Sequence, residues 1–370
     1  MIIGVLKEPS AETRVSVLAE TVAALVKKGV TVWVEQGSGE KASCSDGDYQ
    51  KAGAEVKTRA EVLSSSDILL SIHAPAGLAS VKPGVILLGV YQPLFNAPLM
   101  QEWASKNITS FSLDMLPRTT RAQSMDVLSS QANIAGYKAV LRAANEYGRY
   151  FPMFMTAAGS IAPAKVLILG AGVAGLQAIA TAKRLGSVVE VFDARPAVKE
   201  EVMSLGAKFV EVEGAADASK AGGYAVEQSD DYKQKQQARI AESIAKADIV
   251  ITTAQIPGKK APLLVTEQMI DAMRMGSVII DLAAATGGNT PLTKNNETVI
   301  YKGIKIIGDS SLQSSMPSDA SKLYGKNVLN FLQLIITKEG ALNLNWEDDL
   351  VKGSAVTFDG KIVSERVAAL

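Results

Sequence analysis

The stretch that decides the fold is AKVLILGAGVAGLQAIATAKRLGSVVEVFDARP, residues 164–196. An apolar run is followed by the glycine motif GAGVAG at 170–175, then by an amphipathic segment and a second apolar run that ends in Asp193. This order predicts a strand, a glycine turn, a helix and a second strand. A glycine motif alone is weak evidence, but here the strand, the helix and an acid about 20 residues further on are all in place.

The three glycines of this motif have different mechanical roles. Gly170 permits the tight turn, Gly172 lets the backbone approach a pyrophosphate, and Gly175 lets the helix pack closely on the strand. The free N–H groups at the start of the helix face such a phosphate, because a helix N-terminus attracts anions. The turn, Val173 and Ala174 included, is therefore a candidate dinucleotide site.

The acid that ends the second strand predicts which dinucleotide binds. Asp193 can accept hydrogen bonds from both ribose hydroxyls of the adenosine, and its charge repels a 2′-phosphate. Arg195 can tolerate such a phosphate, but we expect Asp193, at the strand end, to dominate. We therefore predict that Asp193, Ala194 and Arg195 bind NAD(H) in preference to NADP(H).

Strands and helices alternate on both sides of this unit. Apolar runs predict strands at 1–7, 30–37, 66–72, 85–90 and 108–116, and again at 165–170, 187–193, 207–212, 248–254, 276–283 and 304–309. Such alternation is typical of open parallel sheets with helices on both faces. We predict an α/β fold of two doubly wound Rossmann-like domains joined by long helices. The N-terminal domain is expected at 1–133 plus 329–370, and the NAD-binding domain at 134–328.

Smaller segments complete this prediction. Residues 46–56 read as a helix and turn, 320–338 as a long helix, and the tail 346–363 as a hairpin closed at Asp359 and Gly360. Two loops follow strands of the second sheet, where such sheets bind ligands. Their candidate cofactor-binding residues are Thr253, Ala254, Gly287, Gly288 and Asn289. Gly-Gly-Asn is also an ordinary turn sequence, so that loop has a purely structural alternative.

Composition excludes several classes of protein. The chain has 38 basic and 38 acidic residues, a balance that lacks the basic footprint of nucleic-acid-binding proteins. No apolar run approaches the roughly 18 to 20 residues that span a bilayer, and the start MIIGVLKEPS does not resemble a signal peptide. One cysteine, Cys44, and one histidine, His73, predict a reducing cytoplasm, no metal site and little proton chemistry near neutral pH.

A polar stripe marks RTTRAQSMDVLSSQANIAGY, residues 118–137, which lacks glycine and proline until Gly136 and reads as a helix that continues to about residue 148. Short polar residues recur at a spacing that normally carries a buried apolar face: Gln123, Asp126, Ser130 and Asn133, with Ser129 alongside and Arg118 just ahead. These side chains differ from the Lys and Glu of a solvated helix face and lower helix propensity. We favour a face that holds a nicotinamide by directional hydrogen bonds over a merely wet face.

Several stretches together resemble domain I, the NAD(H)-binding part of the alpha subunit of proton-translocating NAD(P) transhydrogenase. They are RAQSMDVLSSQANIAGY (121–137), GAGVAGLQAIATAKRLG (170–186), AGGYA (221–225), ITTAQIPGKKAP (251–262), VIIDLAAATGGN (278–289) and IGVLKEPSAETRVSV (3–17). The resemblance covers essentially the whole chain, and RAQSMD is its most specific element. It implies that Arg118, Gln123, Asp126 and Ser129 surround the nicotinamide. It also implies that Tyr224 belongs to a mobile loop, although a solvated loop with no role is an equal alternative.

The resemblance also implies a reaction and its partners. Hydride passes directly from NADH, held by this chain, to NADP⁺ held on a partner's domain III, in a Re/Si-specific exchange coupled to proton translocation by a separate membrane subunit. The chain stops at Leu370 without a long apolar extension, so we expect the split form of the enzyme. The implied assembly is a homodimer, cytoplasmic and peripheral at the inner face of the cell membrane.

Two other functions stay open from the residues. Alanine dehydrogenase shares the N-terminal pattern, and Arg14 matches its substrate-binding arginine. However, His73 and Tyr91 stand where we would align its lysine and histidine, so we expect His73 to be structural and Arg14 to form a packing or surface pair. A non-catalytic NAD-sensing module is the third interpretation.

Overall fold

The computed structural model describes residues 1–214 and 229–370, and Tyr224 lies outside the described residues. The chain divides into two compact units, the first made of 1–131 and 314–370, the second of 132–313. The expected boundary at 133/134 is close to the observed one. The expected boundary at 328/329 falls inside helix α10 (Pro317–Ile335), all of which belongs to the first unit.

The second unit is a seven-stranded sheet in the order β11-β10-β9-β12-β13-β15-β14. Every neighbouring pair is parallel except β14 and β15. The six parallel strands therefore have the strand order 3-2-1-4-5-6 of doubly wound dinucleotide-binding sheets. The strands are β9 (Lys165–Leu169), β10 (Val188–Phe192), β11 (Lys208–Phe209), β12 (Ile249–Thr252), β13 (Val278–Asp281), β14 (Thr298–Tyr301) and β15 (Ile304–Ile307).

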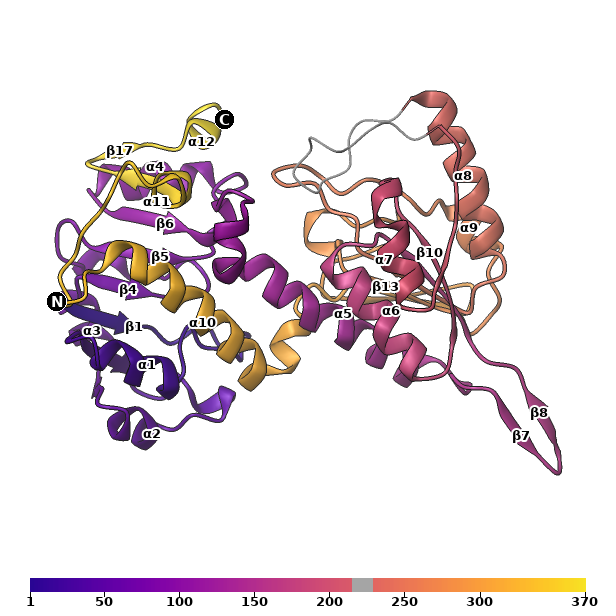
Figure 1. Cartoon of the computed structure of the whole chain (residues 1–370), viewed down its shortest axis with the longest axis horizontal. Helices are drawn as coiled ribbons and strands as arrows, with labels where there is room; N and C mark the ends of the chain where they lie inside the picture. The colour runs from indigo at the N-terminus through magenta and orange to yellow at the C-terminus, as the bar shows by residue number, and fades with distance from the viewer. Residues whose placement is uncertain (215–228) are drawn as a thin grey trace. The chain divides into compact units, whose positions relative to one another are not determined.

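Helices cover both faces of this sheet, which explains its uninterrupted apolar strands (Figure 1). In β9, Val166 and Ile168 face a core shared with α5, α6 and α7, whereas Leu167 and Leu169 face a core shared with α8 and α9. The helices are α5 (Val127–Glu146), α6 (Val173–Arg184), α7 (Lys199–Ser204), α8 (Asp230–Ile244) and α9 (Glu267–Asp271). The first turns of α5 belong to the first unit and the rest of the helix to the second.

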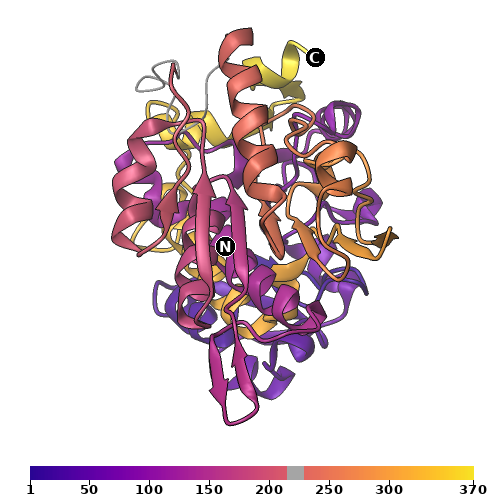
Figure 2. The same ribbon diagram turned by 90° about the vertical axis from the view of Figure 1, so that its right-hand side faces the viewer.

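A hairpin that the sequence did not predict leaves this unit. Strands β7 (Phe154–Thr156) and β8 (Gly159–Ile161) pair antiparallel, and all their residues are exposed. Figures 1 and 2 show the hairpin projecting away from the helices and sheet of its own unit.

The first unit has the same parallel strand order. Its eight-stranded sheet runs β17-β16-β6-β5-β4-β1-β2-β3, and β16 pairs antiparallel with β6 and β17. The strands are β1 (Ile2–Val5), β2 (Thr31–Glu35), β3 (Glu55–Lys57), β4 (Ile68–Leu70), β5 (Ile86–Gly89), β6 (Thr109–Ser112), β16 (Ala355–Phe358) and β17 (Lys361–Ile362). The predicted turn at Asp359 and Gly360 is confirmed, because both residues have positive φ and join β16 to β17.

Helices also cover both faces of the first sheet. One core includes α1 and α10, and the other lies beside α3 and α4. The helices are α1 (Ala19–Val26), α2 (Asp46–Lys51), α3 (Arg59–Ser65), α4 (Ala97–Ser105), α10, α11 (Asp349–Ser354) and α12 (Glu365–Ala368). Two details of the sequence prediction were wrong: β3 follows α2 where only a turn was expected, and α11 replaces the first part of the predicted tail hairpin. The predicted class, two doubly wound parallel sheets, is confirmed.

Candidate functional site

The glycine turn connects β9 to α6 at the point where the sheet order reverses. Gly170 has φ +107°, and a Cβ at Gly175 would lie 1.9 Å from the Gly170 carbonyl oxygen, so neither position tolerates a side chain. A Cβ at Gly172, by contrast, would meet nothing within 4 Å. No side chain of the described residues caps the first turn of α6, which leaves its N–H groups available to a ligand. The turn therefore has the steric and electrostatic form that a pyrophosphate needs.

Asp193 follows β10 and is buried beside this turn. Its Oδ2 accepts a hydrogen bond of 2.7 Å from the Ala171 N–H, which fixes the carboxylate against the glycine loop. Arg195 donates to the same carboxylate from its backbone N–H (2.8 Å), Nε (2.9 Å) and Nη2 (2.7 Å). The hydrogen bonds to Asp193 raise the pKa of the Arg195 guanidinium above its usual value. Sequence reasoning placed both residues at the site but did not foresee that they pair.

The two neighbouring loops meet through Asn289 rather than through the glycines. Its Nδ2 donates to the carbonyl oxygens of Ala254 (2.9 Å) and Pro262 (2.8 Å), and its Oδ1 accepts from the Ala254 N–H (3.1 Å). Both amide hydrogens of this fully buried side chain are thus committed to the protein. The Asn289 side chain therefore sets the shape of the 254–262 loop, and the expected contact of Asn289 with a cofactor stays a prediction.

Other predicted residues of these loops lie beside the glycine turn or support the loops. The Thr253 hydroxyl donates to the Gly170 carbonyl oxygen at 3.1 Å, so Thr253 joins the end of β12 to the glycine turn. Gly287 and Gly288 have φ of +103° and +78°, which glycine adopts without strain. A Cβ at Gly288 would lie 2.8 Å from Asp281 Oδ2, so this glycine serves packing around a buried carboxylate.

The polar stripe is not one helix. Residues Thr120–Met125 form a 3₁₀ helix, η4, and α5 begins only at Val127. Asp126 lies between them with extended backbone (φ −74°, ψ 90°), and its carboxylate accepts from the Ser129 N–H (2.9 Å) and the Ser129 hydroxyl (2.6 Å). Asp126 is thus the N-cap of α5. The predicted unbroken helix from residue 118 was wrong, because this short acid stabilises a helix start better than a helix interior.

The break separates the polar residues into groups with different surroundings. Arg118 and Gln123 are exposed, whereas Asp126 and Ser129 are half-buried and held together. The Ser130 hydroxyl instead donates to Asn327 Oδ1 of α10 at 2.7 Å. The predicted single face of Gln123, Asp126, Ser130 and Asn133 is therefore not formed. The four residues that the resemblance assigned to the nicotinamide do lie within one short segment of the first unit.

Asn133 belongs to the second unit, where it lies next to the dinucleotide turn. Its Nδ2 donates to Gln177 Oε1 of α6 at 3.2 Å. Close by, a Cβ at Gly136 would lie 2.1 Å from the Ala174 carbonyl oxygen, so α5 and the start of α6 are in direct backbone contact. The glycine that ends the polar stretch is thus required for helix packing.

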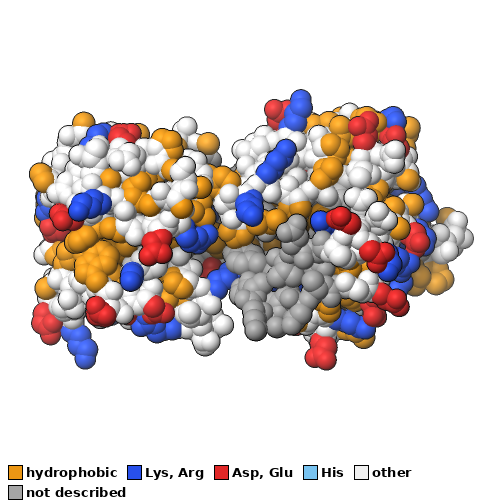
Figure 3. All heavy atoms as spheres, turned by 90° about the horizontal axis from the view of Figure 1, so that it is seen from above, with side chains coloured by type: hydrophobic (Ala, Val, Ile, Leu, Met, Phe, Trp, Pro, Cys, Tyr) orange, Lys and Arg blue, Asp and Glu red, His pale blue; other side chains and the backbone are white. Residues whose placement is uncertain are grey.

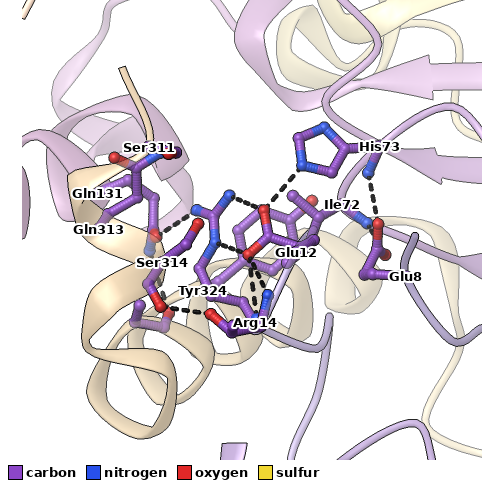
Figure 4. Close-up of polar contacts among 12 residues, drawn as sticks. Glu8, Glu12, Arg14, Ile72, His73, Gln131, Ser311, Gln313, Ser314 and Tyr324 are labelled. Atoms are coloured by element: carbon purple, nitrogen blue, oxygen red, sulfur yellow. Dashed lines mark hydrogen bonds and ion pairs between the residues drawn. The ribbon is translucent and has the colours of Figure 1, made fainter. Parts of the chain in front are cut away.

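A buried charge cluster in the first unit was not predicted. Arg14 forms a bidentate pair with Glu12 (Nε–Oε1 2.9 Å, Nη2–Oε2 2.6 Å), and its Nη1 donates to Gln131 Oε1 at 2.7 Å (Figure 4). His73 Nε2 lies 2.8 Å from Glu12 Oε2. Burial raises the pKa of Glu12, but hydrogen bonds from Arg14 and His73 outweigh it and hold this pKa well below its usual value. Arg14 is therefore part of a packing pair, as expected, but a buried one.

No helix among the described residues has the length and apolar character that crossing a bilayer requires. On the face drawn in Figure 3, acidic and basic side chains are interspersed, and neither sign forms a continuous patch.

Comparisons with known proteins agree with this architecture. Models of the N-terminal and C-terminal domains of the alanine dehydrogenase/PNT family match residues 4–135 and 139–365. The chain is 46% identical over 363 residues to an NAD(P) transhydrogenase subunit alpha protein of Rhodospirillum rubrum, covering 95% of this chain and 94% of that one. It is 26% identical over 384 residues to an alanine dehydrogenase of Mycolicibacterium smegmatis, covering 100% of this chain and 96% of that one. The crystal structure of transhydrogenase from Sinorhizobium meliloti matches with a TM-score of 0.90 and 44% identity, covering 98% of this chain and all (100%) of that one.

Two doubly wound units, one with a complete dinucleotide turn, define the class as a Rossmann-like α/β protein. Within that class, the chain belongs to the alanine dehydrogenase/PNT family. Its sequence is more similar to the NAD(P) transhydrogenase alpha subunits of this family than to the alanine dehydrogenase compared above.

Proposed function

We propose that this chain is the NAD(H)-binding component of a proton-translocating, Re/Si-specific transhydrogenase. In this role it presents NADH to NADP⁺ bound on domain III of a partner. The observation that carries the proposal is the Asp193 carboxylate, fixed against the Ala171 N–H beside the open side of Gly172. The identity to transhydrogenase alpha subunits supports the choice within the family.

The residues present fit a dinucleotide. The first turn of α6 and the open space at Gly172 suit a pyrophosphate, and Asp193 suits the adenosine ribose hydroxyls. For ribose binding, the Arg195 guanidinium orients the Asp193 carboxylate and either shares it with the ribose or moves aside. Tyr224, which lies outside the described residues, is proposed to contact the cofactor.

Bound NADH supplies the hydride, and the chain supplies orientation. We propose that Arg118, Gln123, Asp126 and Ser129 hold the nicotinamide end by directional hydrogen bonds. Asp126 and Ser129 are suited to this because their mutual hydrogen bond fixes the rotamer of both. No O–H or N–H bond is broken in direct hydride exchange, so positioning in a dry site is the main contribution. This matches a segment that contains no histidine.

The partners follow from the same proposal. We propose that the chain associates with a membrane subunit and its NADP(H)-binding domain III, and that it forms a homodimer. The β7–β8 hairpin is a suitable interface for the second subunit of this homodimer. A two-stranded hairpin is at best marginally stable alone in water, and this one exposes Phe154 and Met155 to 42% and 75%.

The test of the cofactor assignment is calorimetric binding of NADH and NADPH to the chain and to Asp193→Asn. We expect clear preference for NADH in the unchanged chain. Loss of hydrogen bonds to a charged acceptor weakens NADH binding roughly ten- to hundredfold in the variant. Glu190→Gln is the matched control, because Glu190 lies on the same strand in an exposed pair with Lys208. Equal affinity of the unchanged chain for NADPH would refute the assignment.

A further inference from the structure

The segment that contains Gln123, Asp126 and Ser129 lies on helix α10 through polar contacts. Asn327 of α10, only 7% exposed, donates from Nδ2 to the Ser124 carbonyl oxygen at 2.8 Å. Its Oδ1 accepts the Ser130 hydroxyl at 2.7 Å. A single buried amide thus binds the chain on both sides of Asp126. Buried polar side chains are normally satisfied in this way, but here the two partners belong to two different helices.

The position of this amide matters because the chain bends between its two contacts. Asp126 has ψ 90°, outside the helical region, so η4 ends and α5 begins in a new direction. The capping bonds that Ser129 donates to Asp126 order the start of α5, but they do not reach η4. Asn327 does reach both elements: its planar amide bonds Ser124 of η4 and Ser130 of α5 and so restrains the angle between them.

A second residue, Gln131, also fixes the first turn of α5 by hydrogen bonds. Gln131 donates from Nε2 to the Ala320 carbonyl oxygen of α10 at 3.0 Å, and its Oε1 accepts from the Arg14 guanidinium at 2.7 Å. Arg14 in turn is immobilised by its buried pair with Glu12 (Figure 4). The start of α5 is therefore fixed by directional bonds, while Gln123 stays exposed.

We infer that Asn327 is a positioning residue for hydride transfer: it clamps η4 to α5 and thereby sets where Gln123, Asp126 and Ser129 point. This inference rests on the proposed function of those three side chains. A displacement of about 1 Å in a reacting geometry can cost a hundredfold in rate. Loss of the clamp should therefore slow transfer much more than it weakens binding of NADH.

The experiment measures single-turnover hydride transfer from NADH on the chain to NADP⁺ on domain III, with calorimetric NADH affinity alongside. We expect Asn327→Ala to slow transfer roughly 10- to 100-fold and to change the NADH dissociation constant less than about threefold, because the phosphate and ribose contacts lie elsewhere. Ser130→Ala should act in the same direction. Ser130→Thr, which keeps the hydroxyl, should restore most of the rate and is the second route if Asn327→Ala folds poorly.

Asn330→Ala is the matched control. Asn330 lies on the same helix and donates to the same Ser124 carbonyl oxygen at 2.9 Å, but it has no bond to Ser130. Its variant should keep the transfer rate within about twofold, since the angle at Asp126 does not depend on it. A lower melting temperature in Asn327→Ala with an unchanged transfer rate would show a merely structural role and overturn the inference.

Gln123→Ala separates this inference from the proposed function. If Gln123→Ala slows transfer and the Asn327 and Ser130 variants do not, the clamp is wrong and the proposed function stands. If Gln123→Ala also leaves transfer unchanged, the assignment of the whole segment to the nicotinamide fails, and the clamp with it.

Discussion

At the scale of single residues, two glycines of the dinucleotide turn have different roles: we expect one to matter for stability and the other for cofactor binding. A Cβ at Gly175 would lie 1.9 Å from the Gly170 carbonyl oxygen, whereas one at Gly172 would meet nothing within 4 Å. We predict that Gly175→Ala lowers the free energy of unfolding by about 1–3 kcal/mol, a typical cost of overpacking. Gly172→Ala should leave it unchanged and weaken NADH binding, because the added methyl occupies the side from which the phosphate approaches. Urea unfolding and calorimetry measure the two effects.

If Gly172→Ala instead lowered stability and left NADH binding unchanged, the turn would be excluded as the phosphate site. Gly148→Ala serves as the control, because a Cβ there also meets nothing within 4 Å and lies away from the turn. It should change neither stability nor affinity.

The buried Glu12 makes a pH-dependent contribution to stability. Its pKa is lowered in the folded chain below the ordinary 4.5, because the hydrogen bonds from Arg14 and His73 outweigh burial. Its stabilisation is therefore present above about pH 4.5 and is lost as the pH falls below that value. We predict that Glu12→Gln lowers the free energy of unfolding by about 3 kcal/mol at pH 7, since it leaves a buried Arg14 charge unpaired. The difference from the unchanged chain should shrink toward pH 3.

Urea unfolding of both proteins across this pH range is the measurement. Glu55→Gln is the control, because Glu55 pairs with Lys57 on the surface and its loss should matter little at any pH. A constant gap between pH 7 and pH 3 would show that Glu12 does not titrate with folding.

At the scale of elements, the sequence correctly predicted the features that depend on local patterns of apolar and turn-forming residues. The two sheets, the glycine turn and the Asp359–Gly360 hairpin turn were found because their signals are local and strong. The break at Asp126 was missed because apolar and polar spacing does not show whether a short acid caps a helix or lies within it. Asn327 was missed for another reason: it is brought to Ser124 and Ser130 by the fold, across about two hundred residues of sequence.

The β7–β8 hairpin is exposed although part of its sequence is apolar. Its strands are apolar in part, and all of their residues are exposed. We predict that Phe154→Ser with Met155→Ser converts the proposed homodimer to a monomer, because these side chains are available for an interface. Sedimentation measures the change. Met203→Ser, which also removes an exposed methionine, should leave the dimer intact. A dimer that survives the double change would place the interface elsewhere.

At the scale of the whole molecule, the two units carry the two halves of the proposed task. The fixed acid and the glycine turn, proposed for the adenosine end, belong to the second unit, and the polar segment proposed for the nicotinamide end belongs to the first. Both assignments come from the sequence and stay predictions. The sequence did not predict that the chain re-enters the first unit at residue 314, because the sequence of α10 fits the last helix of either domain equally well.

Direct hydride exchange makes one prediction about the assembled protein. With NADH that carries deuterium as the transferred hydrogen at C4, the chain plus domain III should move the label to NADP⁺ without dilution by water. The physical reason is that the segment proposed to orient the nicotinamide contains no histidine, and His73, the chain's single histidine, instead bonds Glu12. Mass spectrometry of the NADPH formed measures the label, and the same reaction in D₂O with unlabelled NADH should give unlabelled NADPH. Solvent-derived deuterium would require a proton-exchanging intermediate. NADH formation by the chain alone with L-alanine and NAD⁺ would instead identify an amino-acid dehydrogenase.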